Sequence, residues 1–479
     1  MRRRDFLAGA AAFAACAPAL RRSRPASTHG LQVGDVATGR ASVWARCDRP
    51  APLYIEWDTS ERFASPRRVT GPVAAPDRDH TALADLDGLP PDQTIIVRAR
   101  FGDGAWEHAQ FRTPASRGFR FVWTGDTCGQ GYGRNPEWGG MRGYAALRAA
   151  EPAFFLHSGD LIYADNPIEA EHKTLDGRLW KNVTNERVAR VAQELDDFRA
   201  RFAYNLEDEH VRALAAEVPI LAQWDDHETH NNWWPGQQLD DARYTKVRDS
   251  STLAAWAMRA LREWTPVRGP AIQRVISYGP LLDVIVVDLR SWRTPNDANR
   301  GDTGAMLGAP QAAWLVQQLA ASRARWKIIA CDQPISLVIP DGKANERQEG
   351  YANGDPGPPL GREKELAGVL AALPKNTIFV TADVHYAAAH FYAGAPRPFW
   401  EFVGGPIHAG TFGPNDLDPT FGPELKFQWA PPPGQGNLAP WDGLQTFGTV
   451  DVSAEALRVG LWGIDGKRRY DVTIPYESP

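Results

Sequence analysis

Phe154-Phe155-Leu156-His157-Ser158-Gly159-Asp160 is an apolar run that predicts a buried strand and ends in an aspartate. Five more apolar runs end in the same way, and their terminal acids are Asp126, Asp226, Asp288, Asp332 and Asp383. Aspartate and glutamate make up 58 of 479 residues, so six strand ends would carry less than one acid by chance. Because open α/β sheets bind ligands at the carboxyl ends of their strands, we expect these carboxylates to converge.

Several carboxylates at one edge of a sheet repel one another and raise one another's pKa values, unless cations neutralise them. The whole set therefore predicts a site for more than one metal ion, although a single strand-end aspartate is ordinarily a helix cap. Other candidate ligands lie beside the acids, namely Tyr163, His227, Asn231 and His385. Asp383 and His385 are two residues apart, and on an extended segment both side chains would address one centre.

Apolar strands alternate with amphipathic helical stretches from residue 118 onward. The helical run 311–319, for example, leads into the apolar run 326–330. This alternation predicts an α/β fold with a largely buried sheet between helices. Polar insertions that are longer than ordinary connections are expected to rim a pocket. They span 165–190, 230–248, 293–309 and 340–361.

Residues 29–115 have a different pattern, in which short alternating runs such as 41–46 are separated by Pro, Gly and Asp clusters. These runs predict half-buried antiparallel strands. Segment 85–94 and the run 95–100 resemble the turn and penultimate strand of a fibronectin type III sandwich. We therefore expect a fibronectin III-like β-sandwich at 29–115, followed by a catalytic domain at 118–479 that includes the C-terminal strands.

The chain begins with Arg3-Arg4-Asp5-Phe6-Leu7 and an Ala-rich apolar run, and small residues follow Cys16. This order is typical of an export signal and resembles the twin-arginine type, which a disordered basic tail would not explain. We expect residues 1–28 to be this signal and its linker, read by the twin-arginine export machinery. The mature protein is then periplasmic or extracellular. A lipid anchor at Cys16 is disfavoured, because Phe13 stands where a lipoprotein signal has Leu.

The composition excludes several classes of protein. The 53 basic and 58 acidic residues give a net charge of −5, which argues against a nucleic-acid scaffold or a binder of anionic membranes. No stretch after the signal approaches 18 apolar residues, so no transmembrane segment is expected. Four cysteines are too few for a disulfide framework, and one of them lies in the signal. The oligomeric state stays open.

Four motifs resemble those of the calcineurin-like metallophosphoesterases, and most of all the PhoD-type alkaline phosphatases and phosphodiesterases. They are Gly125-Asp126, Ser158-Gly159-Asp160-Leu161-Ile162-Tyr163, Trp224-Asp225-Asp226-His227-Glu228 with Asn231-Asn232, and Ala382-Asp383-Val384-His385. The motifs follow the expected order over essentially the whole mature chain. The resemblance implies a four-layer core of two packed β-sheets flanked by helices, an N-terminal sandwich, and two or more metals at the strand ends.

The resemblance also implies which residues bind the first metal. Asp126, Asp160, Tyr163 and His385 match one metal position, and Asp160 would bridge to the second. Tyr163 matches the tyrosinate that binds Fe(III) in the related purple acid phosphatases. Cys128 is either a further iron ligand, as in some PhoD-type enzymes, or a buried thiol.

At the second metal position the resemblance places Asp226, Asp332 and Asp383, where many relatives have Asn or His. An oxygen-only set favours Ca²⁺, Mn²⁺ or Mg²⁺ over Zn²⁺. PhoD-type enzymes are similar in pairing Fe(III) with one or two Ca²⁺, so we expect these cofactors, with Mn²⁺ or Mg²⁺ as the alternatives to Ca²⁺.

On the substrate side, His227 matches the histidine that contacts the phosphate and protonates the leaving group, and Asn231 is expected beside it. Arg290 can hold a phosphate by a bidentate fork or form a structural ion pair with Asp288. The expected activity is hydrolysis of small phosphomonoesters or phosphodiesters by a hydroxide formed at the metals. Two alternatives are a phospholipase D-like phosphodiesterase, with a pocket of Tyr132, Trp138, Trp233 and Trp234, and a non-enzymatic, metal-stabilised binding protein.

Overall fold

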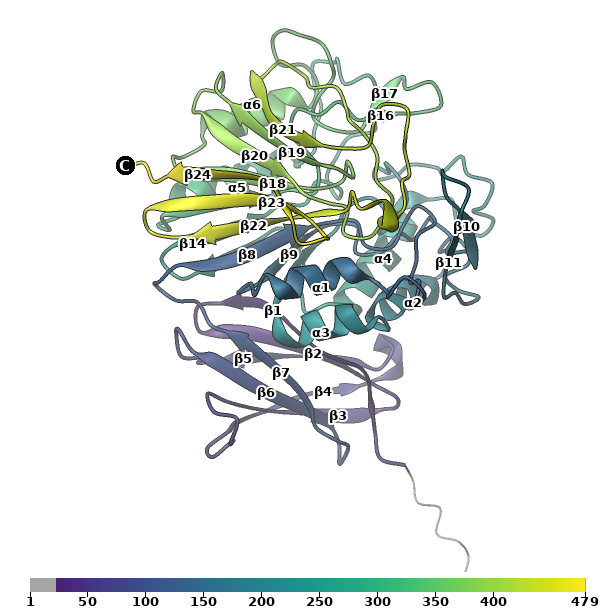
Figure 1. The fold of residues 1–479 in the computed structure, drawn as a ribbon, viewed down its shortest axis with the longest axis vertical. Coiled ribbons are helices and arrows are strands. Elements are labelled where there is room, and N and C mark those ends of the chain that lie inside the picture. Colours follow the sequence, from purple (N-terminus) through teal and green to yellow (C-terminus); the bar gives the residue numbers. More distant parts are fainter. Residues whose placement is uncertain (1–22, 479) are drawn as a thin grey trace, which may run out of the picture.

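The structure is a computed structural model that describes residues 23–478, and its N-terminal part is an antiparallel β-sandwich, at the bottom of Figure 1. The strands are β1 (Ser27–Ala37), β2 (Arg40–Cys47), β3 (Ala51–Asp58), β4 (Arg67–Ala74), β5 (Thr81–Asp87), β6 (Thr94–Phe101) and β7 (Glu107–Arg112), with a short 3-10 turn η1 (Pro76–Arg78). Three of them, β1, β2 and β5, pack on the sheet β4-β3-β6-β7. The predicted run 95–100 lies in β6, the penultimate strand, whose alternate residues point into the core.

The first large sheet contains three parallel strands, β8 (Phe119–Thr124), β9 (Phe155–Ser158) and β12 (Ile220–Gln223). Three C-terminal strands extend it beyond β8, each antiparallel to its neighbour, namely β22 (Thr446–Val452), β23 (Ala456–Gly463) and β24 (Arg468–Pro475). On its other side β12 pairs in parallel with β1 at Gly34. The sandwich strands β1, β2 and β5 therefore continue the catalytic sheet, which has nine strands in all.

The second large sheet has seven strands in the order β13-β14-β15-β18-β20-β19-β21. Their bounds are β13 (Arg274–Tyr278), β14 (Leu282–Val286), β15 (Trp326–Ala330), β18 (Thr377–Thr381), β19 (Ala387–Tyr392), β20 (Phe399–Val403) and β21 (Pro423–Trp429). The four strands β14, β15, β18 and β20 are parallel, and the other three are antiparallel to their neighbours. Both large sheets of the core are therefore mixed.

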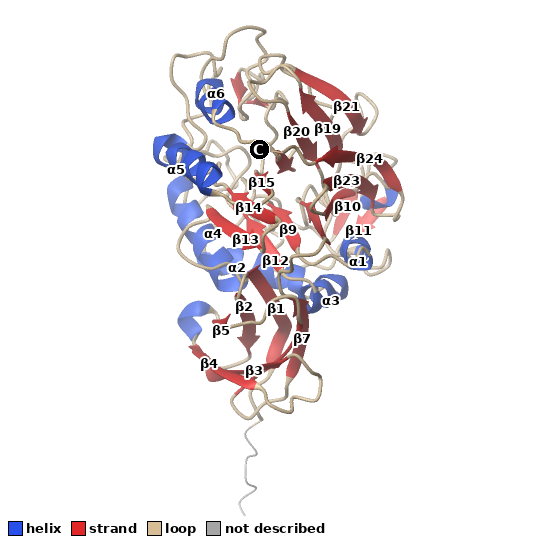
Figure 2. Cartoon of the chain, turned by 90° about the vertical axis from the view of Figure 1, so that its left-hand side faces the viewer, coloured by secondary structure: helices blue, strands red, loops and turns tan. Residues whose placement is uncertain are grey.

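Helices cover the outer faces of the two large sheets (Figure 2). On the side of the first sheet are α1 (Arg142–Ala149), α2 (Leu195–Leu206), α3 (Glu209–Glu217) and α4 (Ser250–Trp264), and on the side of the second are α5 (Gly308–Ala321) and α6 (Glu363–Ala371). Small elements in the insertions are the hairpins β10 (Glu171–Lys173) with β11 (Leu179–Lys181) and β16 (Pro340–Asp341) with β17 (Arg347–Gln348), and the turn η2 (Pro440–Asp442). The expected α/β class and layered core are confirmed.

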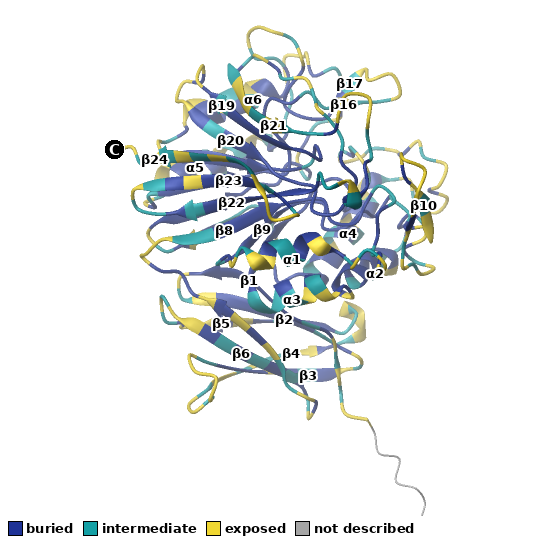
Figure 3. Ribbon diagram, in the orientation of Figure 1, coloured by how far each residue is buried: buried dark blue, intermediate teal, exposed yellow. Residues whose placement is uncertain are grey.

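The strand β15 shows why the core strands read as continuous apolar runs. All five of its residues are buried. Ile328 and Ala330 face the core between the two sheets, whereas Ile329 packs with residues of α5 and α6. A strand that is covered on both faces has no polar face to show in its sequence. Figure 3 shows the same contrast across the molecule, with buried central strands and exposed residues on the sandwich and the loops.

Three cysteines, Cys47, Cys128 and Cys331, are buried free thiols. Within residues 23–478 no helix is long and apolar enough to cross a membrane. The predicted export signal and Cys16 lie outside the described residues.

A buried ion pair fixes the sandwich to the catalytic domain. Asp35 of β1 is 1% exposed and accepts hydrogen bonds from the Arg274 guanidinium of β13, the shortest at 2.9 Å. Arg274 also donates to the carbonyl of Ala222 in β12, and the backbone N–H of Arg268 donates to Asp35. The Asp35–Arg274 pair thus joins β1, β12 and β13.

We expect Asp35→Asn to lower the free energy of unfolding by about 3–5 kcal/mol, because it leaves a buried guanidinium without its counter-charge. Urea unfolding of the full chain measures the change. The matched control is Arg458→Met, which breaks an ion pair with Asp471 whose side chains are 48% and 37% exposed and should cost less than about 1 kcal/mol. Equal losses in the two variants would contradict the prediction.

Candidate metal centre

Five of the six strand-end aspartates converge where the carboxyl ends of the two parallel sets face each other. The first sheet supplies Asp126, Asp160 and Asp226 from β8, β9 and β12, and the second supplies Asp332 and Asp383 from β15 and β18. The sixth, Asp288 after β14, has a structural role. Its carboxylate accepts from the Trp224 indole at 2.9 Å and from two backbone N–H groups of the following turn.

The structure brings together the residues predicted for the first metal. One ligand atom from each of Asp126, Asp160 and His385 lies within 4.8 Å of the others. The Tyr163 hydroxyl is 2.9 Å from His385 Nε2, which lies 3.7 Å from Asp126 Oδ1. The other imidazole nitrogen of His385 faces the carbonyl oxygen of Gly410. A hydrogen bond from Nδ1–H to this carbonyl leaves the lone pair on Nε2, where it can coordinate a metal.

Two further groups lie beside the first. Asp160, Asp226 and His227 form one, and Asp225, Asp226 and Asp383 form the other. Asp160 belongs to two groups, as a bridging ligand requires. Asp383 and His385 fall in different groups, which differs from the sequence expectation that they address one centre. Their φ angles are 71° and 62°, so the backbone there is left-handed and the spacing rule for extended chain does not hold.

Asp126 and Asp160 are also left-handed, with φ of 63° and 53°. Such conformations cost about 1–3 kcal/mol each in residues other than glycine, and they cluster at functional sites. The glycines that precede these two aspartates allow neighbouring segments of the chain to lie close to the backbone. A Cβ on Gly125 would lie 2.8 Å from the Cβ of Ala382, and one on Gly159 would lie 2.4 Å from the Cβ of Asp225.

The carboxylates of the cluster fit metal ions. Both oxygens of Asp126 and of Asp332, and one oxygen of Asp226, are buried without a hydrogen-bond partner in the described part of the chain. Burial and neighbouring carboxylates raise the pKa values of Asp126, Asp160, Asp332 and Asp383 well above the ordinary range. Hard cations bind unpartnered carboxylate oxygens of this kind. The Asp, Tyr and His donors at the first metal position suit a hard cation of higher charge.

His227 is held between the metal cluster and a second carboxylate. Its Nδ1 lies 2.7 Å from Asp165 Oδ1, its backbone N–H donates to Asp160, and its ring stacks on Tyr163. Burial would lower the pKa of His227, but Asp165 and Asp226 outweigh that effect and raise the pKa to about 10. Asp165 therefore orients the imidazole beside the cluster and favours its protonated form.

Arg290 has an environment that the sequence does not predict. Its side chain is 0% exposed, and its guanidinium bonds to Asp225 and Glu349. From Arg290, the Asp288 carboxylate accepts only the backbone N–H. The ion pair between the two side chains, one of the two alternatives for Arg290, therefore does not form.

Other predicted residues lie at the margin of the site. Asn231 is exposed, and its backbone N–H donates to Asp165. Its neighbour Asn232 donates to Asp226 at 2.6 Å. Cys128 belongs to none of the three groups; its thiol faces the sulfur of Met141 at 3.8 Å, and burial raises its pKa well above the ordinary value. Of the aromatic residues considered for a lipid pocket, Tyr132 and Trp233 are buried in packing, and Trp138 and Trp234 are half-buried.

Four acidic residues that sequence reasoning missed complete the site, namely Asp165, Asp225, Glu228 and Glu349. Glu228 accepts from the backbone N–H groups of Asp160, Leu161 and Asp225, and so joins the ends of β9 and β12. Asp225 and Glu228 could have been noticed as neighbours of Asp226 and His227. Glu349 lies in an insertion with no apolar run before it. Asp165 follows the short apolar run 161–164, but that run belongs to the loop after β9 and not to a strand, so the strand-end pattern marks neither residue.

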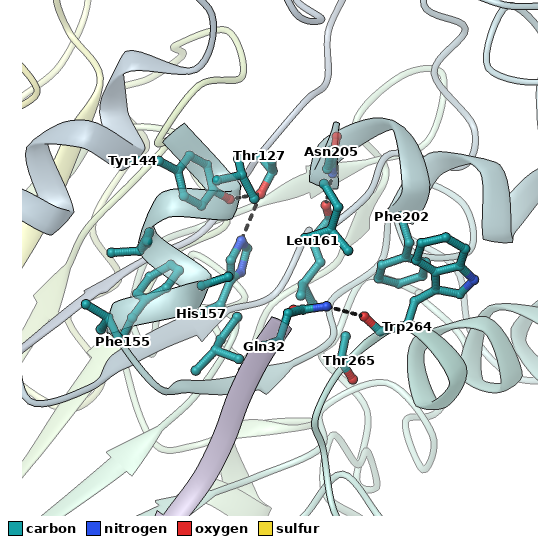
Figure 4. Close-up of a pocket in the computed structure, with 16 residues that line it drawn as sticks. Gln32, Thr127, Tyr144, Phe155, His157, Leu161, Phe202, Asn205, Trp264 and Thr265 are labelled. Carbon is teal, nitrogen blue, oxygen red and sulfur yellow. Dashed lines mark hydrogen bonds between the residues drawn. The ribbon is translucent and has the colours of Figure 1, made fainter. Parts of the chain in front are cut away.

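A small pocket of about 60 Å³, lined by Thr127 and His157 among others, is distinct from the carboxylate cluster. Figure 4 shows Thr127 at its edge, where the hydroxyl lies 2.8 Å from both His157 Nε2 and the Tyr144 hydroxyl. Burial lowers the pKa of His157 to about 3, so this imidazole is neutral. The cavity walls are mostly apolar, and the network fixes the turn that carries Asp126.

Comparison with known proteins agrees with this geometry. The chain is 26% identical over 424 residues to alkaline phosphatase D of Bacillus subtilis (strain 168), a match that covers 81% of this chain and 70% of that protein. The solved structure of PhoD superposes with a TM-score of 0.71 at 18% identity, covering 94% of this chain and 90% of that one. A purple acid phosphatase from yellow lupin (Lupinus luteus) seeds superposes with a TM-score of 0.57 at 13% identity, covering 94% and 74%.

Family patterns match both parts of the chain. Residues 12–115 match the N-terminal domain of PhoD-like phosphatases, and residues 121–459, more than half of the chain, match the PhoD-like phosphatase family. The chain therefore belongs to the PhoD-like phosphatase family and is a phosphatase-type hydrolase.

Proposed function

We propose that this phosphatase-family chain is an exported, metal-dependent phosphoesterase that hydrolyses small phosphomonoesters or phosphodiesters. The observation that carries the proposal is the convergence of Asp126, Asp160 and His385 with the carboxylates of the second sheet. The buried oxygens of Asp126 and Asp332, which lack a hydrogen-bond partner in the described part of the chain, support bound cations there. Bound cations would lower the pKa of a water molecule and neutralise charge on the phosphoryl oxygens.

The donor sets support two kinds of cation. The Tyr163 hydroxyl beside His385, Asp126 and Asp160 provides mixed oxygen and nitrogen donors for Fe(III). Asp226, Asp332 and Asp383 provide oxygens alone, which suits one or two Ca²⁺, or Mn²⁺ or Mg²⁺ in their place. Metal analysis of the natively exported protein would test both assignments, and zinc alone would contradict them.

The arrangement of His227 supports a role as general acid. A protonated imidazole within the reach of the cluster can donate a proton to the leaving oxygen. Asp165 orients the ring through Nδ1 and leaves Nε2 as the nitrogen that meets the substrate. Trp138 and Trp234 are both half-buried, and this burial gives no reason to prefer a lipid substrate over a small phosphoester.

We expect Asp160→Asn to reduce the hydrolysis of p-nitrophenyl phosphate and of its bis ester at least about 100-fold, because the bridging charge is lost. Asparagine tolerates the left-handed backbone of this position, so the fold should remain. A chelator should have the same effect on the native protein. The matched control is Asp283→Asn, a buried aspartate of β14 bonded to Ser322 and not to the cluster, which should keep its activity. Full turnover by Asp160→Asn would refute the metal assignment, and a preference for a choline lipid would indicate a phospholipase D-like enzyme.

We expect Asp165 to act through His227. His227→Asn should lower kcat/KM by about 10²–10⁴-fold and Asp165→Asn by about 10–100-fold. The double variant should be no slower than His227→Asn, because residues that act as a unit are not additive. Steady-state kinetics of the three variants measures this, and losses that multiply would show that the two residues act separately.

We also propose that the twin-arginine machinery exports the chain, since Arg3 and Arg4 precede the apolar run. Lysine at both positions should retain the protein in the cytoplasm, as measured by cell fractionation. Lysine at Arg21 and Arg22, which follow the apolar run, is the control and should leave export intact. If Cys16→Ala releases the protein from membranes, a lipid anchor is present after all.

A further inference from the structure

Arg290 is a fully buried guanidinium enclosed by acidic side chains. Its Nε donates to Asp225 at 2.7 Å, and its Nη1 donates to Glu349 at 2.5 Å. Three predicted ligands of the second metal position surround it at longer range, with Asp332 at 3.4 Å, Asp383 at 3.6 Å and Asp226 at 3.9 Å. Five carboxylates therefore surround the Arg290 guanidinium, and the buried Arg293 guanidinium adds a second positive charge 3.6 Å from Glu349.

The fold fixes both partners of this guanidinium. Glu228 accepts the backbone N–H of Asp225, which sets the end of β12. Glu349 lies in the insertion 340–361, and its carbonyl accepts from Arg293 and from Arg362. Arg362 is 2% exposed and also donates to the carbonyls of Thr294 and Pro295, so it joins the insertion 340–361 to the insertion 293–309.

This anchoring argues against a mobile phosphate ligand. If Arg290 turned toward a substrate, Asp225 and Glu349 would be left buried and unpaired, and breaking a buried pair in this way is strongly unfavourable. An arginine guanidinium stays protonated in proteins, so the charge is permanent as well as fixed.

We propose that Arg290 is a positioning residue that acts as the resident cation of the second metal position. It holds Asp226, Asp332 and Asp383 at their strand ends before a metal binds, and it would keep its bonds to Asp225 and Glu349 when a metal is bound. This inference rests on the proposed metal-dependent function and assigns Arg290 to the carboxylate cluster instead of to the phosphate.

The experiment compares Arg290→Met and Arg290→Lys with the unchanged full chain, each stripped by a chelator and then titrated with Ca²⁺ alone. Without metal, Arg290→Met should lower the midpoint of thermal unfolding by about 3–5 °C, since the buried carboxylates around it lose the guanidinium charge. Saturating Ca²⁺ should restore at least half of this loss, because the ion supplies the missing charge. Arg290→Lys keeps the charge and should lose less than half as much without metal.

The matched control is Arg201→Met. Arg201 is a buried arginine of α2 that donates to the carbonyls of Asn166 and Arg190 and not to the carboxylate cluster. Its loss of stability should be the same with and without Ca²⁺. The proposal is overturned if the stability lost in Arg290→Met is, like that lost in Arg201→Met, the same with and without Ca²⁺. If Arg290→Met does not fold, Arg290→Lys decides, because a loss as large as that of Arg201→Met would also overturn it.

A calorimetric titration with inorganic phosphate separates the two roles of Arg290. The proposal expects Arg290→Lys to bind phosphate within about threefold of the unchanged chain, since lysine keeps the charge that holds the carboxylates. Binding weakened more than about tenfold, with an unaltered response to Ca²⁺, would make Arg290 a substrate ligand and overturn the proposal. An unchanged chain that gains no stability from Ca²⁺ would instead overturn the proposed function, while the metal-free comparison still tests Arg290.

Discussion

Mutual repulsion among buried carboxylates is the constraint on which the rest of the structure depends. Two sets of parallel strands aim their acidic ends at one point, and the two sheets are packed so closely there that only glycine fits at position 125. Rigid strands, backbone hydrogen bonds donated to Glu228 and left-handed turns keep the carboxylates from separating. The energy of this crowding is available for the binding of cations, since a cation relieves it.

The strand-end rule predicted the position of the site because it depends only on chain direction and burial. Apolar runs mark strands that are covered on both faces, and the acid that follows each run must then lie at the edge. Finer features depend on conformation. The extended backbone expected at Asp383 and His385 was wrong, because both residues are left-handed. Arg290 bonds to Asp225, whereas Asp288 accepts backbone N–H groups of the turn after β14.

Sequence patterns did not predict which residues of the insertions would lie at the site. Asp165 and Glu349 reach the site through loops whose course is set by tertiary hydrogen bonds, such as those from Arg362 to five backbone carbonyls. No periodicity encodes such contacts. The strands therefore determine the metal-binding geometry, whereas the insertions supply the groups that orient His227 and retain Arg290.

The continuity of the nine-stranded sheet has a consequence for the order in which the protein is made. Strand β1, at the start of the described chain, pairs with β12 at Ile220, and β8, which leads into Asp126, lies beside β22 at residues 446–452. The sheet that supports the site is therefore incomplete until almost the whole chain has left the ribosome. Such long-range pairings fold slowly and expose unpaired edges meanwhile. The nascent chain thus exposes the unpaired edge of β8 until the residues of β22 have been synthesised.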